Sequence, residues 1–173
     1  KKRGLSINLS TAFFVPKPFT PFQWEAQITP EEYMRRVHLL QSAIKTKMVD
    51  YRYHGPELSR LEAVLARGDR RLGAILEEAV KNGVRLDSWE EYFRNDIWME
   101  AFASCGLDPD FYACREFGKE EVFPWQTISI GLRREFFWHE REKAYQSLTT
   151  SDCRTQCAGC GANSLCPGGV CDA

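Results

Sequence analysis

The sequence predicts a mainly helical protein that begins with one strand and ends in a cysteine-rich, metal-binding tail. Apolar residues recur at helical spacing through most of the 173 residues. A short alternating run lies near the start, and five of the seven cysteines fall between residues 153 and 171. Hydrophobic residues make up 43% of the chain, which is enough to bury one sizeable core.

The strand is predicted over residues 5–15. Leu5, Ile7 and Leu9 alternate with serine and asparagine, which is typical of a strand. Residues 49–54 offer a short extended piece, but no convincing second strand follows to pair with the first. Because a lone strand leaves its backbone groups without partners, we expect its sheet to come from outside this sequence.

A proline-rich loop follows the strand and reads V-P-K-P-F-T-P-F-Q-W over residues 15–24. Three prolines in six residues stop helix and sheet and hold the backbone extended. Stiff loops that leave a strand end are common places for binding residues, and this one presents Lys17, Phe19, Phe22 and Trp24. The alternative is a packed connector whose aromatic rings cover the core.

Helices are predicted for most of the remaining chain. Thr29-Pro30-Glu31-Glu32 and Ser88-Trp89-Glu90-Glu91 are capping boxes that begin two of them. Gly68 and Asp69 separate two short helices into a hairpin. The predicted helices span residues 29–48, 56–67, 69–83, 88–106 and 132–148, with a short turn after Asp108-Pro109.

The cysteine-rich tail, residues 153–171, is too short to bury an apolar core. Metal binding can order such a segment because the binding free energy is then folding free energy. Four thiolates suit a structural zinc ion or a [4Fe–4S] cluster, and the spacing does not separate the two. Disulfides or free thiols are the alternative, although nothing marks the chain as secreted. The candidate ligands are Cys153, Cys157, Cys160, Cys166 and Cys171.

Charge is divided unevenly along the chain. Residues 1–71 carry 13 Lys and Arg against seven Asp and Glu, although the net charge is −1. A basic half can meet a nucleic acid or a ribosomal substrate, but solvated helix faces are the interpretation we favour. No apolar run would span a membrane and no secretory signal is visible, so we expect a cytoplasmic protein. The sequence begins Lys-Lys-Arg without an initiator methionine, which indicates a fragment or a processed chain.

Two stretches together resemble one family. The first is the proline-rich loop directly after a strand. The second is a W-x-x-I-x-x-G pattern beginning at Trp125, then a helix, then S-D-C-R-x-x-C-x-x-C-G over residues 151–161. This combination resembles the C-terminal portion of radical S-adenosylmethionine (radical SAM) enzymes, in the branch with an N-terminal cobalamin-binding-type domain. The resemblance covers almost the whole chain.

The resemblance implies that residues 5–15 are the last strand of a partial (β/α) barrel and that the helices form a C-terminal cap. The corresponding divisions are residues 1–28, 29–131 and 132–173. In this family a [4Fe–4S] cluster, held by three cysteines after the first barrel strand, cleaves S-adenosylmethionine to a 5′-deoxyadenosyl radical. Residues near the nucleoside or the substrate would be Phe14, Lys17, Phe19, Phe22 and Trp24.

The C-x3-C-x2-C of residues 153–160 copies the spacing of the cluster motif, but it lies after a helix near the end of the sequence. Gly159 also stands where the family has an aromatic residue. We therefore expect zinc or an auxiliary iron–sulfur cluster there, and an inactive chain unless the rest of the parent enzyme is present. The alternative is a non-enzymatic helical module with a zinc knuckle that binds RNA or protein.

Overall fold

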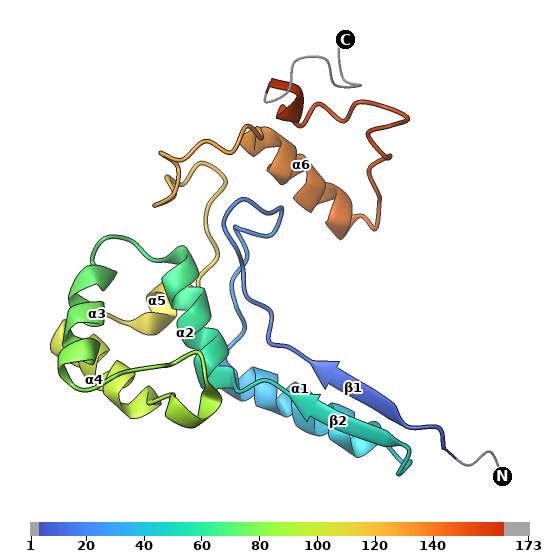
Figure 1. Ribbon diagram of the computed structural model, residues 1–173. Coiled ribbons are helices and arrows are strands. Elements are labelled where there is room, and N and C mark those ends of the chain that lie inside the picture. Colours follow the sequence, from blue (N-terminus) through green and yellow to red (C-terminus); the bar gives the residue numbers. More distant parts are fainter. Residues whose placement is uncertain (1–3, 165–173) are drawn as a thin grey trace. The chain divides into compact units, whose positions relative to one another are not determined.

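The computed structural model describes residues 4–164 and is mainly helical, as predicted (Figure 1). Its elements are β1 (Ile7–Thr11), α1 (Pro30–Ala43), β2 (Val49–Tyr53), α2 (Pro56–Arg67), α3 (Leu72–Lys81), the 3-10 turn η1 (Glu90–Tyr92), α4 (Asn95–Ser104), α5 (Pro109–Ala113), α6 (Arg134–Tyr145) and the 3-10 turn η2 (Ala162–Ser164).

The chain forms two compact units. The first unit contains the described residues up to Val15 together with Ala26–Arg115, and the second contains Pro16–Glu25 with the described residues from Glu116 onward. The proline-rich loop therefore belongs with the C-terminal part of the chain, although it follows the first strand in sequence.

The two strands of the first unit pair in parallel. Ile7 lies opposite Val49 and Thr11 opposite Tyr53, and the Ile7 amide donates to the Met48 carbonyl at 2.8 Å. The prediction that no strand of this sequence pairs with the first one is therefore wrong. The extended piece 49–54 is its partner, reached through a crossover that contains α1, as parallel strands require.

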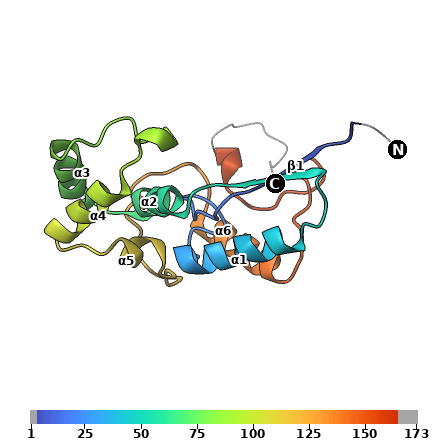
Figure 2. The ribbon, with the colours of Figure 1, turned by 90° about the horizontal axis from the view of Figure 1, so that it is seen from below.

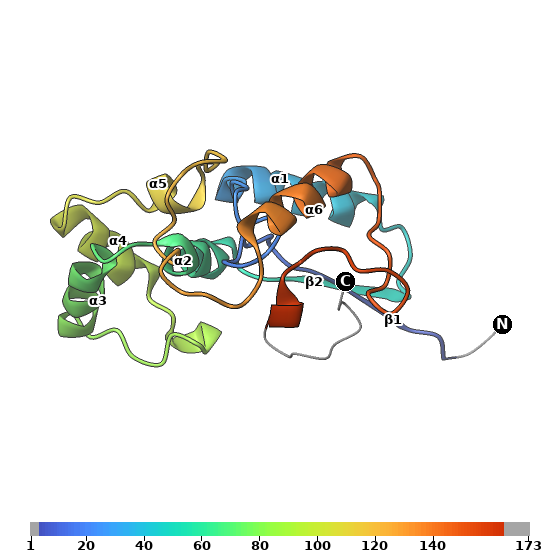
Figure 3. The same ribbon diagram turned by 90° about the horizontal axis from the view of Figure 1, so that it is seen from above.

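Helix α1 covers one face of the strand pair and runs beside it in both turned views (Figures 2 and 3). Phe13 stacks on Tyr33 of the helix with ring centroids 4.3 Å apart, and Val37 and Tyr51 join this small core. Thr29 caps the helix as predicted, because its hydroxyl accepts from the Glu32 amide at 3.3 Å. The helix ends at Ala43, earlier than predicted, since the backbone turns extended at the next residue toward β2.

Helices α2–α5 surround the main core of the first unit. Arg67 is only 1% exposed, and its guanidinium donates to the carbonyls of Tyr112, Ala113 and Arg115 at 2.7–2.8 Å. These bonds satisfy backbone carbonyls at the end of α5, a helix of five residues that is too short to supply donors for them. Arg67 thus ties the end of α2 to the end of α5.

The predicted helix over 88–106 is wrong in its first part. Ser88 makes no capping bond; the backbone is extended at Trp89 and Phe93, and the regular helix begins at Asn95. The Trp98 indole is buried and donates to Asp87 at 3.0 Å. The buried partner of this segment is therefore Trp98, while Trp89 remains exposed.

The second unit is built on aromatic packing. Trp24, Phe117, Phe123, Trp125 and Phe137 form its buried cluster. The loop is held to the later part of the chain by backbone and side-chain bonds, since the Phe117 amide donates to the Trp24 carbonyl at 2.8 Å.

Helix α6 is tied to Glu25, the residue that directly follows the proline-rich loop. Arg141 forms ion pairs with Glu25 and Glu116. Tyr145 donates to the Glu25 carboxylate at 2.8 Å, and this bond to a carboxylate raises the pKa of Tyr145. Hence the proline-rich loop is a structural part of the second unit as well as a candidate binding segment.

Candidate ligand cavity and cysteine-rich tail

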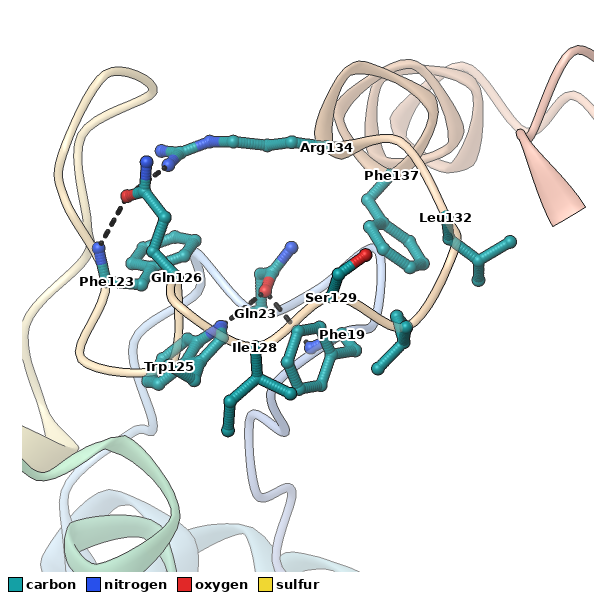
Figure 4. A pocket seen from close by; sticks show the side chains of 11 residues that line it. Phe19, Gln23, Phe123, Trp125, Gln126, Ile128, Ser129, Leu132, Arg134 and Phe137 are labelled. Carbon is teal, nitrogen blue, oxygen red and sulfur yellow. Dashed lines mark hydrogen bonds between the residues drawn. The ribbon is translucent and has the colours of Figure 1, made fainter. Parts of the chain in front are cut away.

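A cavity of about 210 Å³ opens in the second unit, between the proline-rich loop and the segment that leads into α6 (Figure 4). Its walls are mostly apolar, with Phe19, Trp125, Ile128 and Phe137 among them. Gln23 and Arg134 add the main polar groups. Apolar walls with a few placed polar groups are the usual composition of a ligand site.

Gln23 lies at the centre of this arrangement (Figure 4). The side chain is 3% exposed. Its Oε1 accepts one hydrogen bond from the Trp125 indole and another from the Phe19 amide, both 3.1 Å long. Two N–H donors aimed at one atom identify that atom as the amide oxygen. The amide nitrogen is therefore turned away from both donors.

A tight turn in the loop positions Gln23. The Gln23 amide donates to the Thr20 carbonyl at 3.1 Å, and the Thr20 hydroxyl donates to the Lys17 carbonyl at 2.8 Å. Phe19 has φ of +58°, an uncommon conformation for a bulky residue that is found mostly at turns and functional sites. The turn directs the Phe19 amide at Gln23 and its ring at the cavity.

Arg134 forms the opposite wall. Its Nη2 donates to the carbonyls of Lys119 and Glu121 at 2.6 and 2.7 Å, and its Nη1 donates to Gln126 Oε1 at 3.3 Å. The guanidinium lies 4.5 Å from the Phe123 ring centroid. Its charge is thus fixed beside the cavity, and no acidic side chain of the described residues lines it.

The described lining residues of this cavity include no cysteine, histidine or carboxylate, which are the usual nucleophiles, acids and bases of enzymes. Ser129 supplies the only hydroxyl of that lining, and it accepts a weak hydrogen bond from the Gly131 amide at 3.4 Å. A hydroxyl without a neighbouring base is a poor nucleophile.

The five predicted binding residues do not form one site. Phe19 lines the cavity, whereas Trp24 is fully buried in the aromatic core. Lys17, Phe14 and Phe22 are exposed and are not among the lining residues. Sequence reasoning missed Gln23, Trp125 and Arg134. The glutamine within the loop motif and the tryptophan that opens the W-x-x-I-x-x-G pattern were the available signals.

Three of the five predicted metal ligands fall within the described residues. Cys153 and Cys157 are exposed and Cys160 is half-buried. Cys166 and Cys171 lie outside the part of the chain that the structure describes. Within residues 4–164, no three side chains of the ligand types gather closely enough to hold one ion.

Two of these cysteines nevertheless share a repeated local geometry. The Gly159 amide donates to Cys157 Sγ and the Ala162 amide to Cys160 Sγ, both at 3.4 Å. In each case the donor is the second residue after the cysteine. Such N–H donors stabilise negative charge on sulfur. The turns after Cys157 and Cys160 thus point backbone N–H groups at sulfur, as is found around metal-bound cysteines.

Gly161 fixes the turn against the start of α6. Its φ is +95°, and an added Cβ would come within 3.0 Å of the Gly131 carbonyl oxygen and of Arg133 Cγ. The Arg133 amide donates to the Cys160 carbonyl at 2.8 Å. Only glycine fits this close approach, so the cysteine turn has a defined position beside the helix.

A second cavity of about 370 Å³ lies in the first unit, at the carboxyl ends of β1 and β2. Ser10, Arg52 and His54 come from the strands and their ends, and Glu57 and Glu90 from the following segments. Ligands of parallel α/β sheets bind at this end of the strands.

No protein-family model, curated protein or solved structure matches this chain. Within residues 4–164, every helix is too short or too polar to cross a lipid bilayer.

Proposed function

We propose that this chain is the C-terminal part of a radical SAM enzyme, in which β1 and β2 are the last strands of a partial barrel. The longer enzyme that supplies the preceding strands is called the parent below. The observation that carries the proposal is the incomplete parallel sheet. Within residues 4–164, β1 has β2 as its one neighbour, and its other edge is bare.

The hydrogen-bond pattern of β1 leaves its outer edge available to pair with another strand. The Ile7 amide donates to the Met48 carbonyl just before β2, and the Thr11 carbonyl accepts from the His54 amide just beyond β2. Because backbone groups alternate in direction along a strand, the amides of Asn8 and Ser10 face the opposite edge. A parallel sheet of two strands is unusual, since parallel strands are normally covered and paired on both sides.

The two faces of the strand pair also fit a barrel wall. Leu9 lies opposite Tyr51, so its side chain is on the apolar face that α1 covers. Ser10 lies opposite Arg52 on the other, polar face. Helix α1 covers this face only in part, because the side chains of Ile7 and Leu9 are still 47% and 38% exposed. A completed sheet would leave them far less exposed. Further helices and strands of the parent would cover them.

The cavity at the carboxyl ends of the strands adds a second line of support. Barrel enzymes carry their active sites at this face. The parent would hold the [4Fe–4S] cluster and S-adenosylmethionine, and Ser10, Arg52 and His54 would line the edge of its substrate site. The cysteines of residues 153–160 have the spacing of the initiating motif but follow α6 and not a first barrel strand, so we expect no reaction from the chain alone.

The cysteine-rich tail would hold a zinc ion or an auxiliary iron–sulfur cluster. Cys153, Cys157 and Cys160 would be ligands, completed by Cys166 or Cys171. The two N–H···S bonds fit this role because metal-bound sulfur is a thiolate and needs donors around it. The metal would serve to order the tail, which is too short to bury an apolar core of its own.

The test uses the parent, purified without oxygen and reconstituted with iron and sulfide. With dithionite and S-adenosylmethionine it should release 5′-deoxyadenosine, and residues 1–173 alone should not. A reconstituted parent that binds no cluster and releases no 5′-deoxyadenosine would overturn the proposal.

A colourless chain that holds zinc and binds RNA with a steep salt dependence would support the RNA-binding alternative.

A further inference from the structure

We infer that the cavity around Gln23 binds a neutral planar ring that presents a hydrogen-bond acceptor, a carbonyl oxygen or a ring nitrogen, on its edge. The inference rests on the geometry of the second unit and does not depend on the proposed function. It assigns a ligand class to a site whose polar centre, Gln23, lies in the proline-rich loop.

The donor that selects the ligand is Nε2 of Gln23. The amide oxygen is occupied by Trp125 and Phe19, so the nitrogen is left to face the open space between Arg134 and Phe137 (Figure 4). Among the described residues this nitrogen has no hydrogen-bond partner. Water reaches this nitrogen through the cavity, since it is not one of the buried polar atoms that lack a partner. An acceptor on a ligand would displace that water and take over its hydrogen bond.

The aromatic side chains of the cavity wall favour a flat, apolar ligand. Phe123 and Trp125 stack with centroids 4.7 Å apart and planes at 24°, and Phe19 and Phe137 add two more rings. Aromatic rings prefer to pack against other rings in offset or edge contacts. At about 210 Å³, the cavity is smaller than the roughly 300–1,000 Å³ of sites for drug-sized ligands. A single ring or a ring-bearing side group therefore fits.

The charges around the cavity favour a ligand with a neutral hydrogen-bond acceptor over a ligand with a charged group. Arg134 places positive charge at the wall and no described acidic residue lines the cavity, so a cationic ligand is disfavoured. The Arg134 donors already bind the carbonyls of Lys119 and Glu121 and the side chain of Gln126. Its fork is thus not free to clamp a carboxylate in the bidentate way that recognises anions.

Three small probes separate these properties: benzamide, which has a ring and an acceptor; toluene, which has the ring alone; and benzylammonium, which has a ring and a cation. Saturation-transfer NMR measures binding, and the indole N–H resonance of Trp125 reports the site. Benzamide should bind roughly tenfold more tightly than toluene, which is about the contribution of one hydrogen bond. Benzylammonium should bind most weakly.

The decisive variant is Gln23→Glu. It keeps an oxygen for the Trp125 and Phe19 donors but replaces the cavity-facing N–H₂ by a second oxygen. Benzamide should then lose roughly tenfold in affinity, toluene should change little, and benzylammonium should gain. The control Ile128→Ala should weaken benzamide and toluene alike, because it removes only apolar wall.

Two results would overturn the inference. One is equal binding of benzamide and toluene to the natural protein, a comparison that needs no variant to fold. The other is unchanged benzamide affinity in a folded Gln23→Glu protein, recognised by a retained Trp125 indole resonance. Neither result bears on 5′-deoxyadenosine formation by the parent, so failure here and failure of the proposed function are separate outcomes.

Discussion

Gln23 accepts a hydrogen bond of 3.1 Å from the indole of Trp125, a residue 102 positions later in the chain. Both side chains are buried. The bond connects the proline-rich loop to the segment before α6 and at the same time orients the Gln23 amide. One contact therefore both holds the second unit together and prepares its cavity.

Replacing Gln23 by methionine keeps the length of the side chain but leaves the buried Trp125 indole and the Phe19 amide without an acceptor. We expect the free energy of unfolding to fall by about 1–3 kcal/mol. Urea denaturation followed by tryptophan fluorescence measures this change. The same substitution at Gln41, which is exposed on α1, should stay within about 0.5 kcal/mol; equal losses at the two sites would contradict the role given to Gln23.

Arg67 offers a second stability test, in the first unit. Replacement by methionine removes the donors for three carbonyls at the end of α5, and we expect a loss of about 3–5 kcal/mol. Arg70→Met is the matched control, because Arg70 is exposed. A change below about 1 kcal/mol for Arg67→Met would show that water replaces the lost donors.

Cys114 should be an unreactive thiol. Burial, and then the negative charge of Asp110, raise the pKa of Cys114 from an ordinary 9.0 to about 11. Its thiolate population near pH 8 is then about 100-fold lower than that of an ordinary thiol. Alkylation by iodoacetamide, mapped by mass spectrometry, should modify the exposed Cys153 first.

The same raised pKa gives a sign for the pH dependence of stability. The folded protein holds the Cys114 proton more tightly than the unfolded chain does, so this contribution is complete below pH 9. It is lost as the pH rises from about 9 to about 11. Comparing the unfolding of the natural protein with that of Cys114→Ala across this range tests the sign, and a natural protein that gains stability relative to the variant would contradict it.

Metal removal should act on the tail alone. We expect Cys157→Ala or Cys160→Ala to abolish tight zinc or cluster binding and to loosen residues 153–164 and the end of α6. Helix α1 should remain intact, because it packs in the other unit. Cys105→Ala, outside the tail, is the control and should keep the full metal content. Metal analysis and limited proteolysis measure both effects; unchanged protection of the tail in the Cys157 and Cys160 variants would rule out ordering by metal.

The helices could be predicted because their signals are local. The predicted bounds of 56–67 agree with α2, the cap of Thr29 is found as expected, and the short turn predicted at Asp108-Pro109 is helix α5. The pairing of β1 with β2 could not be predicted in this way, since β2 is five residues long and a parallel partner is set by tertiary packing around α1. The Ser88 capping box failed for the same reason: the burial of Trp98 decides where the helix begins.

The cavity was predicted only in part. The proline-rich loop and Phe19 are visible in the sequence as a stiff aromatic segment, but the role of Gln23 depends on Trp125, which no local pattern connects to it. Likewise the charge at Arg134 becomes part of a site only because Lys119 and Glu121 hold its guanidinium in place.

The most direct test of the proposed barrel is hydrogen exchange at β1, measured by NMR in residues 1–173 and by mass spectrometry of the same segment in the parent. In residues 1–173, the Leu9 amide, which faces β2, should be protected, whereas the amides of Asn8 and Ser10, which face the bare edge, should exchange rapidly. In the parent, Asn8 and Ser10 should become as protected as Leu9, because a preceding strand pairs with them. Rapid exchange at Asn8 and Ser10 in the parent would show that β1 is a true edge strand and would contradict the proposal.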